Sequence, residues 1–294
     1  MPATFDYLRA FSRNIGWITA AEQATLRKSR VAIAGMGGVG GSHLLTLARL
    51  GVGRFRIADF DSFDLVNFNR QAGAGVSTLG RPKAQVMAEM ARDINPELDI
   101  EIFDQGLRDD NLEAFLGGCA AYVDGLDFFA FDMRLRTFDT CARLGVPATT
   151  AAPLGMGSAL MNFVPGGMGF DDYFCWSGQP DEERALRFMV GMSPRFLQDY
   201  IVVPESVNLD ERRGPSTVMA CMLCSGIAAT EVLKLVLHRG KVLAAPHGMH
   251  FDAYRNKMVT TWRPGGNRNP IQRVMLAFAR RRLATLRAQA ATRS

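Results

Sequence analysis

Short apolar runs along this chain alternate with longer segments whose apolar residues have helical spacing. The runs at 31–34 and 55–58, and the stretch 122–126, have the length and composition of buried parallel strands. Between the first two runs, residues 43–50 predict a helix that ends at the glycines 51 and 53. Alternating strands and helices predict an α/β fold with a mainly parallel sheet.

The pattern becomes less regular after residue 165. Residues 166–180 are rich in glycine and predict a loop. Residues 181–192 predict a helix after Pro180, and a second short helix is expected to end at Tyr200. An apolar helix is predicted at 218–237. We expect a C-terminal mixed-sheet portion, and we divide the chain at 1–165, 166–215, 216–264 and 265–294.

The last segment predicts a basic amphipathic C-terminal helix after a linker at residues 264–267. Its apolar residues at helical spacing are Ile271, Val274, Met275, Phe278, Leu283 and Leu286. It has no acids and seven arginines, so the net charge of +5 leaves −2 for the rest of the chain. Three roles stay open: docking on the core, contact with nucleic acid such as tRNA or with an anionic surface, and binding an acidic protein.

Composition narrows the class of protein. With 294 residues, 48% of them hydrophobic, the chain can form one large α/β domain or two unequal ones. No run reaches the roughly 18 uninterrupted apolar residues of a membrane span, and the N-terminus lacks an apolar signal core. Five scattered cysteines do not form a disulfide framework, so we expect a cytoplasmic protein.

A glycine-rich turn directly follows the first predicted strand. Gly35, Gly37 and Gly40 match G-x-G-x-x-G, and Gly38 lies among them. The first glycine permits the tight turn, the second lets the backbone approach a phosphate, and the third lets helix and strand pack closely. Asp59 follows the next strand, 19 residues after Gly40, where it can accept bonds from ribose hydroxyls. These features predict a Rossmann-like, doubly wound nucleotide-binding fold.

The residues after Asp59 favour ATP over a dinucleotide. Asp61 leads to a polar run with a later lysine: Asn67, Asn69, Arg70, Gln71 and Lys83. Arg70 can contact phosphate oxygens through its planar fork, and Lys83 supplies a point charge. A dehydrogenase needs none of these, so hydride transfer to NAD is disfavoured. Asp127, after the third apolar run, is a candidate to hold Mg²⁺ beside a triphosphate.

Together these motifs resemble the ThiF/MoeB/HesA superfamily, the bacterial relatives of ubiquitin-activating enzymes. The resemblance covers most of residues 8–262. The matching pieces are GMGGVGG (35–41), DFDSFD (59–64), NFNRQ (67–71), GRPK (80–83), VDGLD (123–127), Ser12-Arg13-Asn14, and Phe251 to Tyr254 in a late strand.

The resemblance implies an ATP- and Mg²⁺-dependent adenylation site in a homodimer. The glycines would line the phosphates, Asp59 would hold ribose with Asp61 also in the nucleotide-binding set, and Asp127 would hold Mg²⁺. The remaining phosphate contacts would come from Asn67, Arg70, Gln71 and Lys83, with Arg13 reaching across from the neighbouring subunit. The implied reaction is attack of a carboxylate oxygen on the α-phosphorus of ATP, which leaves an acyl-adenylate and pyrophosphate.

The resemblance allows different substrates. The first is the C-terminus of a small carrier protein or peptide, supplied in trans and activated for transfer to sulfur or an amine. The alternative is a carboxylate on tRNA, activated to cyclise threonylcarbamoyladenosine. Residues 166–215 stand where relatives place the crossover loop over the substrate's tail. A third hypothesis is a nucleotide-binding partner protein without turnover.

Many relatives hold a structural zinc with two C-x-x-C pairs, whereas this chain has one, Cys221 and Cys224. Cys175 with His247 or His250 would make an irregular set of four ligands, so zinc is not expected. The pair lies in the apolar helix and is predicted to be buried. The competing hypothesis is a thiol that captures the activated acyl group, for which Cys175 in its predicted loop is the more accessible candidate.

Overall fold

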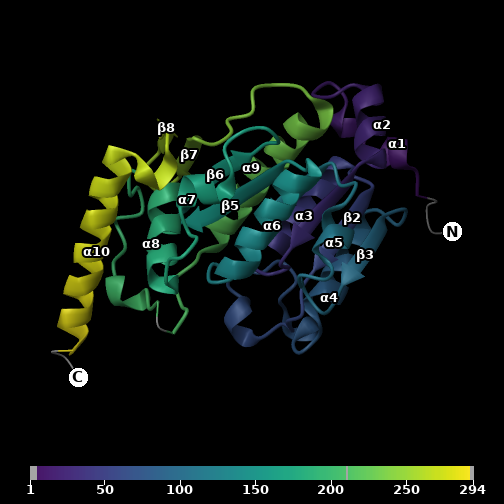
Figure 1. Ribbon diagram of the computed structural model, residues 1–294. Coiled ribbons are helices and arrows are strands. Elements are labelled where there is room, and N and C mark those ends of the chain that lie inside the picture. The colour runs from purple at the N-terminus through teal and green to yellow at the C-terminus, as the bar shows by residue number, and fades with distance from the viewer. Residues whose placement is uncertain (1–4, 210, 292–294) are drawn as a thin grey trace.

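One eight-stranded sheet forms the centre of the protein (Figure 1), in a computed structural model that describes residues 5–209 and 211–291. The strand order is β3-β2-β1-β4-β5-β6-β7-β8. The strands are β1 (Arg30–Ala34), β2 (Arg54–Ala58), β3 (Asp99–Phe103), β4 (Ala121–Asp124), β5 (Ala148–Leu154), β6 (Gly157–Phe163), β7 (His247–Asp252) and β8 (Lys257–Trp262). The first five pair in parallel and the last three pair antiparallel, which confirms the predicted fold class.

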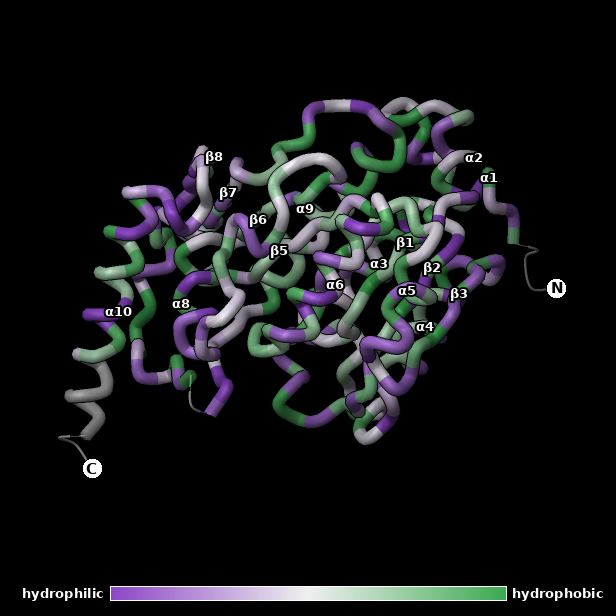
Figure 2. Tube along the Cα trace, viewed as in Figure 1, coloured by the Kyte–Doolittle hydropathy of each residue, from purple (hydrophilic) through white to green (hydrophobic). Residues whose placement is uncertain are grey.

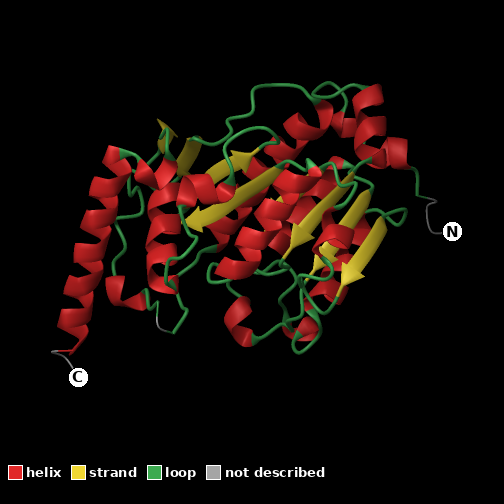
Figure 3. Ribbon diagram, in the orientation of Figure 1, coloured by secondary structure: helices red, strands yellow, loops and turns green. Residues whose placement is uncertain are grey.

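Helices cover both faces of the sheet (Figure 3). They are α1 (Tyr7–Ala10), α2 (Ala20–Lys28), α3 (Gly40–Leu50), α4 (Lys83–Ile94), α5 (Leu112–Leu116), α6 (Phe131–Leu144), α7 (Phe170–Phe174), α8 (Asp181–Met192), α9 (Val218–Leu237) and α10 (Pro270–Ala291). Because side chains alternate along a strand, Val31 and Ile33 join the core shared with α3, α4 and α9. Ala32 and Ala34 join the core shared with α5 to α8.

The long helix α9 is part of the core. It lies against α3, β5 and β6, and both Cys221 and Cys224 are buried in it, as predicted. By length and composition alone, α9 is apolar enough to cross a membrane. Half of its most apolar 18-residue window is buried inside the protein, as expected of a core helix.

Two predictions between residues 166 and 200 are wrong. The stretch 166–180 is not a simple loop, because it contains α7 and buries four aromatic side chains: Phe170, Tyr173, Phe174 and Trp176. The helix at 181–192 has the predicted bounds. The short helix expected up to Tyr200 is replaced by turns. Phe196 adopts a left-handed backbone (φ 45°), and Ser193 bonds to His250 at 2.8 Å, which directs the chain away from a helix.

The predicted linker at 264–267 is also wrong, because this turn is packed into the core. Asn267 donates hydrogen bonds to the carbonyls of Phe174 and Arg187. A Cβ at Gly266 would lie only 2.1 Å from the carbonyl oxygen of Tyr173. The turn therefore fixes where α10 begins.

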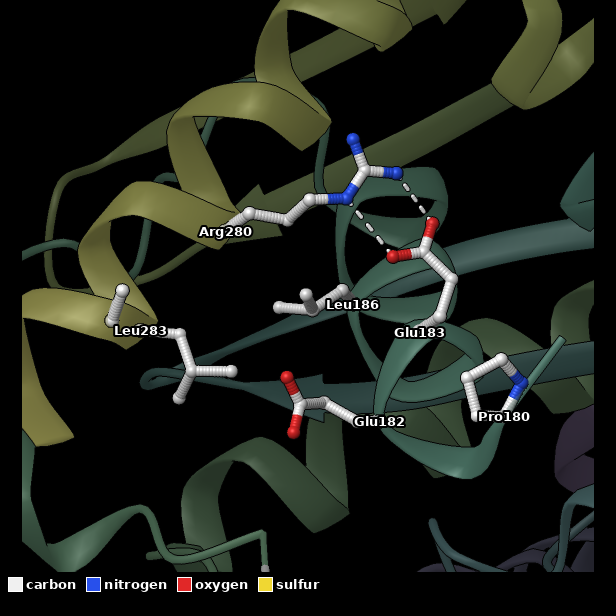
Figure 4. A pocket seen from close by; sticks show the side chains of 7 residues that line it. Pro180, Glu182, Glu183, Leu186, Arg280 and Leu283 are labelled. Carbon is white, nitrogen blue, oxygen red and sulfur yellow. Dashed lines mark hydrogen bonds and ion pairs between the residues drawn. The ribbon is translucent and has the colours of Figure 1, made fainter.

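Helix α10 docks on α8, which supports the first of its three predicted roles. Hydrophilic and hydrophobic residues alternate along it (Figure 2). Leu276 and Ala279 are buried against Leu186 and Val190 of α8. Arg280 forms two hydrogen bonds with Glu183 beside a groove of about 460 Å³ between the helices (Figure 4).

The docked face agrees with the predicted one only in part, since Met275 and Leu283 pack against the buried cluster between α8 and α10. Ile271, Val274 and Phe278 are more than half exposed, whereas Gln272 and Leu276 are buried. The position of α8 selects the face, since apolar residues lie on more than one side of α10. The predicted contact of Leu286 lies outside the described side chains.

Candidate nucleotide-binding site

The C-terminal ends of β1, β2 and β4 meet at one edge of the sheet. Gly35 N donates to the Ala58 carbonyl at 2.7 Å, and Gly125 N donates to the Ala34 carbonyl at 2.9 Å. The loops after these strands are therefore held side by side, as parallel pairing requires.

The glycine turn is built around close backbone contacts. Gly35 has φ +84°, and a Cβ there would lie 2.1 Å from the carbonyl oxygen of Gly125. A Cβ at Gly40 would lie 1.7 Å from the carbonyl oxygen of Gly35. At Gly37 the nearest atom is a side-chain nitrogen of Gln71, 3.6 Å away. Gly35 and Gly40 therefore make the turn, whereas a side chain at Gly37 would be in ordinary contact with Gln71.

Helix α3 begins at Gly40, three residues before the predicted start at His43. No side chain caps its first turn. The first N–H groups of an 11-residue helix that has no side-chain cap can bind an anion. This arrangement fits the predicted contact with phosphates.

Asp59 links the glycine turn to the loop after β2. Its carboxylate accepts hydrogen bonds from Met36 N at 2.6 Å and Asp61 N at 2.7 Å. Burial raises the pKa of Asp59 above its usual range, and the two hydrogen bonds oppose that shift. The structure places Asp59 at the sheet edge, so its contact with ribose stays a prediction that fits the geometry.

Lys83 is the first residue of α4 and is 7% exposed. Its Nζ lies 3.0 Å from Asp61 Oδ2, and its backbone N–H donates to the Asp61 carbonyl. Asp61 thus holds Lys83, a pairing that the sequence did not predict. An ammonium has three donors, so Lys83 keeps capacity for a phosphate.

The polar run after Asp61 flanks the glycine turn. Arg70 donates to the Val66 carbonyl and to Asn69, and its stem lies beside Gly38. Gln71 is buried, and its Oε1 has no hydrogen-bond partner among the described residues. A buried polar atom needs a hydrogen-bond partner, so Gln71 fits a contact with a ligand beside Gly37.

Asn67 has a local structural contact. Its Oδ1 accepts a hydrogen bond from Asp64 N at 2.9 Å, which closes the 3₁₀ turn at Leu65–Asn67. This contact explains why an amide is useful at this position. A contact with phosphate through the Nδ2 group of Asn67 stays a prediction.

Asp127 lies three residues beyond β4 and is exposed. Its carboxylate accepts one hydrogen bond, from Phe129 N at 2.9 Å, which leaves oxygen lone pairs for a cation. Across the described residues, no three His, Cys, Asp or Glu side chains are grouped as a metal site. Mg²⁺ commonly binds through one or two carboxylates plus phosphates, so Asp127 fits that mode.

Arg13 is exposed in the 3₁₀ turn Ser12–Asn14. That turn follows α1, and Asn14 ties it to the Leu50 carbonyl at the end of α3. Its predicted contact with ATP in a neighbouring subunit requires a dimer, so this contact stays a prediction.

The cysteines have different surroundings. Burial raises the pKa of Cys221, which Ser216 and Arg70 oppose, and burial raises the pKa of Cys224 to about 12. Both are therefore poor nucleophiles. Cys221 Sγ nevertheless lies next to the glycine turn, 3.3 Å from a Cβ placed on Gly38. Cys175 is partly exposed at the end of α7 and accepts a hydrogen bond from Arg268 Nε.

Sequence reasoning missed Arg134, a buried residue of α6 that bonds the loop carrying Asp127. A signal was present: Arg134 falls on the apolar stripe formed by Phe131, Phe138 and Cys141. An arginine on the buried face of a helix requires partners there.

Comparison with known proteins identifies relatives along much of the chain. The ThiF family profile matches residues 11–274. The tRNA threonylcarbamoyladenosine dehydratase of Bacillus subtilis is 36% identical over 141 residues, covering 48% of this chain and 55% of that protein. The sulfur carrier protein ThiS adenylyltransferase of Escherichia coli is 32% identical over 162 residues, covering 54% and 63%. The chain thus spans about half the length of the curated relatives it matches.

Solved structures share the fold at low sequence identity. The crystal structure of E. coli MccB with succinimide has a TM-score of 0.67 and 17% identity, covering 88% of this chain and 73% of that chain. The structure of E. coli tRNA N6-threonylcarbamoyladenosine dehydratase has a TM-score of 0.57 and 21% identity, covering 79% and 95%.

Proposed function

We propose, since the chain belongs to the ThiF family, that it is an ATP-dependent adenylyltransferase that activates a carboxylate. One observation carries the proposal. A glycine turn, an uncapped helix start and the side chains of Asp59, Arg70 and Lys83 converge on one edge of the sheet. That set fits a nucleoside triphosphate. The turn, the helix start and Asp59 would also suit a dinucleotide, but Arg70 and Lys83 add cations that hydride transfer does not need.

Each group has a distinct task in this proposal. The start of α3 and the glycine turn hold phosphates through backbone N–H groups. Arg70 and Lys83 neutralise charge as it builds on the phosphates, and Gln71 offers a buried polar contact beside them. Mg²⁺, held by Asp127, would supply further charge neutralisation when bound.

The reaction needs positioning more than covalent help. A carboxylate oxygen attacks the α-phosphorus, the bond to the β-phosphate oxygen breaks, and pyrophosphate leaves with those electrons. No proton has to be moved at the attacking oxygen at neutral pH, because a carboxylate is already ionised. The contribution of the site is therefore alignment and charge stabilisation.

We favour the C-terminus of a small carrier protein or peptide as the substrate, with sulfur or an amine as the later acceptor. Relatives named for such substrates support this choice, including the ThiS adenylyltransferase and the SAMP-activating enzyme E1 of Haloferax volcanii. We place the enzyme in the cytoplasm as a homodimer in which Arg13 serves the partner's site.

The second candidate is activation of a carboxylate on tRNA. The 36% identity to a tRNA threonylcarbamoyladenosine dehydratase favours it. The exposed arginines of α10, Arg273, Arg281 and Arg282, are available to phosphates after the helix has docked.

ATP–pyrophosphate exchange with Mg²⁺ tests the proposal. One arm receives a small-protein and peptide fraction and the other a tRNA fraction from the same cells, with Lys83→Ala as the control for each. Exchange with peptides alone supports the first substrate class, and exchange with tRNA alone supports the second. ATP binding without exchange in either arm would leave two explanations: a substrate absent from both fractions, or a nucleotide-binding protein without turnover.

A further inference from the structure

A buried ion pair lies beside the loop that carries Asp127. Arg134 Nε donates to Asp124 Oδ2 at 2.8 Å, and both side chains are 2% exposed. Thr150 Oγ1 donates to the same oxygen at 3.0 Å. Leu126 N donates to the other oxygen at 3.2 Å. Asp124, at the end of β4, is thus fully engaged inside the protein.

The other nitrogens of the Arg134 guanidinium donate hydrogen bonds to the loop backbone. Nη2 donates to the carbonyls of Leu126 at 2.7 Å and Asp127 at 2.9 Å, and Nη1 donates to the carbonyl of Phe128 at 3.1 Å. Three consecutive carbonyls therefore converge on one planar cation. Since the carboxylate of Asp127 also bonds to Phe129 N, its direction follows that backbone.

This contact is buried, and an aromatic ring covers the guanidinium. The ring of Phe188 in α8 lies 5.1 Å from the guanidinium carbon of Arg134. A buried ion pair is weak evidence of net stabilisation, because desolvation offsets much of its attraction. What Arg134 adds beyond a charge is geometry, since a planar fork can hold several acceptors in fixed directions.

We propose that Arg134 is a positioning residue for Asp127. By fixing the backbone at residues 126–128, Arg134 sets the direction of the Asp127 carboxylate. It thereby sets the affinity for Mg²⁺ beside ATP, although its own contacts are with backbone carbonyls. The inference rests on the proposed function for the identity of the ligand. The contact between Arg134 and the loop backbone does not depend on the proposed function.

Arg134→Lys separates the two parts of the contact. Lysine keeps a cation for Asp124, but its compact ammonium cannot hold three carbonyls in the same plane. Thr150→Val is the matched control, because it removes a bond to Asp124 and leaves the loop carbonyls held. Thermal unfolding of both variants checks that each one folds.

Two readouts test the inference. Amide hydrogen exchange of the free protein is measured at Leu126 and Phe129, and calorimetry measures binding of a non-hydrolysable ATP analogue across a Mg²⁺ titration. In Arg134→Lys we expect faster amide exchange in this loop. We also expect the affinity for Mg²⁺ in the presence of the analogue to fall roughly tenfold, as for other residues that orient a metal ligand. Binding of the analogue without Mg²⁺ should not change, and Thr150→Val should match wild type in both readouts.

A double-mutant cycle with Asp127→Asn gives the sharpest distinction. If Arg134 acts through Asp127, the loss of Mg²⁺ affinity in the double variant should equal that of Asp127→Asn alone. Additive losses, or an Arg134→Lys protein that behaves like Thr150→Val, would overturn the inference. A wild-type protein that does not bind Mg²⁺ with the analogue would overturn the proposed function. Amide exchange then tests separately whether Arg134 fixes the loop backbone. Faster exchange in Arg134→Lys supports that contact, and unchanged exchange overturns it.

Discussion

The parallel strands β1 to β5 and the antiparallel end of the sheet with α8 and α10 are organised by different rules. In the parallel part, strand direction brings the βα loops to one edge, so Gly35, Asp59 and Asp127 all lie on loops at that edge. In the other part, contacts such as Asn267 with Phe174 join residues far apart in sequence. The comparison teaches that strand direction and turn chemistry bring the site's loops together, whereas side-chain fit across the core places the C-terminal helices.

The largest expected effect is in the glycine turn. Gly40→Ala forces a Cβ to within 1.7 Å of a backbone oxygen, so we expect a loss of about 4 kcal/mol or more in the free energy of unfolding. Gly37→Ala, whose nearest neighbour is a side chain at 3.6 Å, should lose less than about 1 kcal/mol. Urea unfolding of both proteins measures the difference, and equal stabilities would contradict the backbone account of this turn.

Asp127→Ala should have the next largest effect, on turnover rather than folding. Removing a carboxylate that holds Mg²⁺ should lower pyrophosphate release by about a hundredfold or more. Because the Asp127 side chain is exposed, the midpoint of thermal unfolding should stay near that of wild type. Asp110→Ala, another exposed acid, serves as the control. Normal pyrophosphate release by a folded Asp127→Ala protein would exclude the magnesium assignment.

A third experiment moves to the C-terminal part. Leu276 is 3% exposed and Val274 is 68% exposed on the same helix. Leu276→Ala should lower the free energy of unfolding by about 2–4 kcal/mol, and Val274→Ala by less than about 0.5 kcal/mol. Chemical denaturation compares them. A larger loss for Val274→Ala would mean that the originally predicted apolar face of α10 is the packed one.

The sequence was sufficient for the parts of the site that depend on local geometry. The spacing of the glycines, Asp59, Arg70 and Lys83 predicted residues that the structure brings to one edge, and the bounds of α8 followed from Pro180 and the apolar spacing. Asp61 was predicted in the nucleotide-binding set, but its pairing with Lys83 was not predicted. Pairing depends on how α4 sits against the β2 loop, which spacing does not determine.

The failures lie where tertiary contacts override local preference. Nothing near Phe196 predicts its left-handed backbone, and the nearby Ser193 bonds to a histidine 57 residues away. Gly266 looked like part of a linker because glycine is common in linkers, but here glycine allows close contact with Tyr173. Arg134 was also missed, but unlike Phe196 and Gly266 it had a signal in the sequence, because it lies on the apolar stripe of its helix.

The smallest expected effect concerns the ion pair that joins α10 to α8. Burial alone would raise the pKa of Glu183, but hydrogen bonds from Arg280 and Arg187 outweigh it and lower the pKa below the usual 4.5. A carboxyl with a lowered pKa in the folded state stabilises the protein above pH 4.5, and that stabilisation is lost as the pH falls through the lowered value. Arg280 is nearly half exposed, so we expect the pair to contribute about 1 kcal/mol or less.

Arg280→Gln should therefore unfold at a lower temperature than wild type at pH 6, and the gap should shrink as the pH falls below 4.5, because protonated Glu183 no longer attracts Arg280. Arg281→Gln removes an exposed charge from the same helix and controls for the change in net charge. Calorimetric scans from pH 6 down to pH 3 give the comparison. A gap that persists undiminished at pH 3 would show that Arg280 holds α10 through the packing of its aliphatic stem, and the docking of this helix would then rest on shape rather than charge.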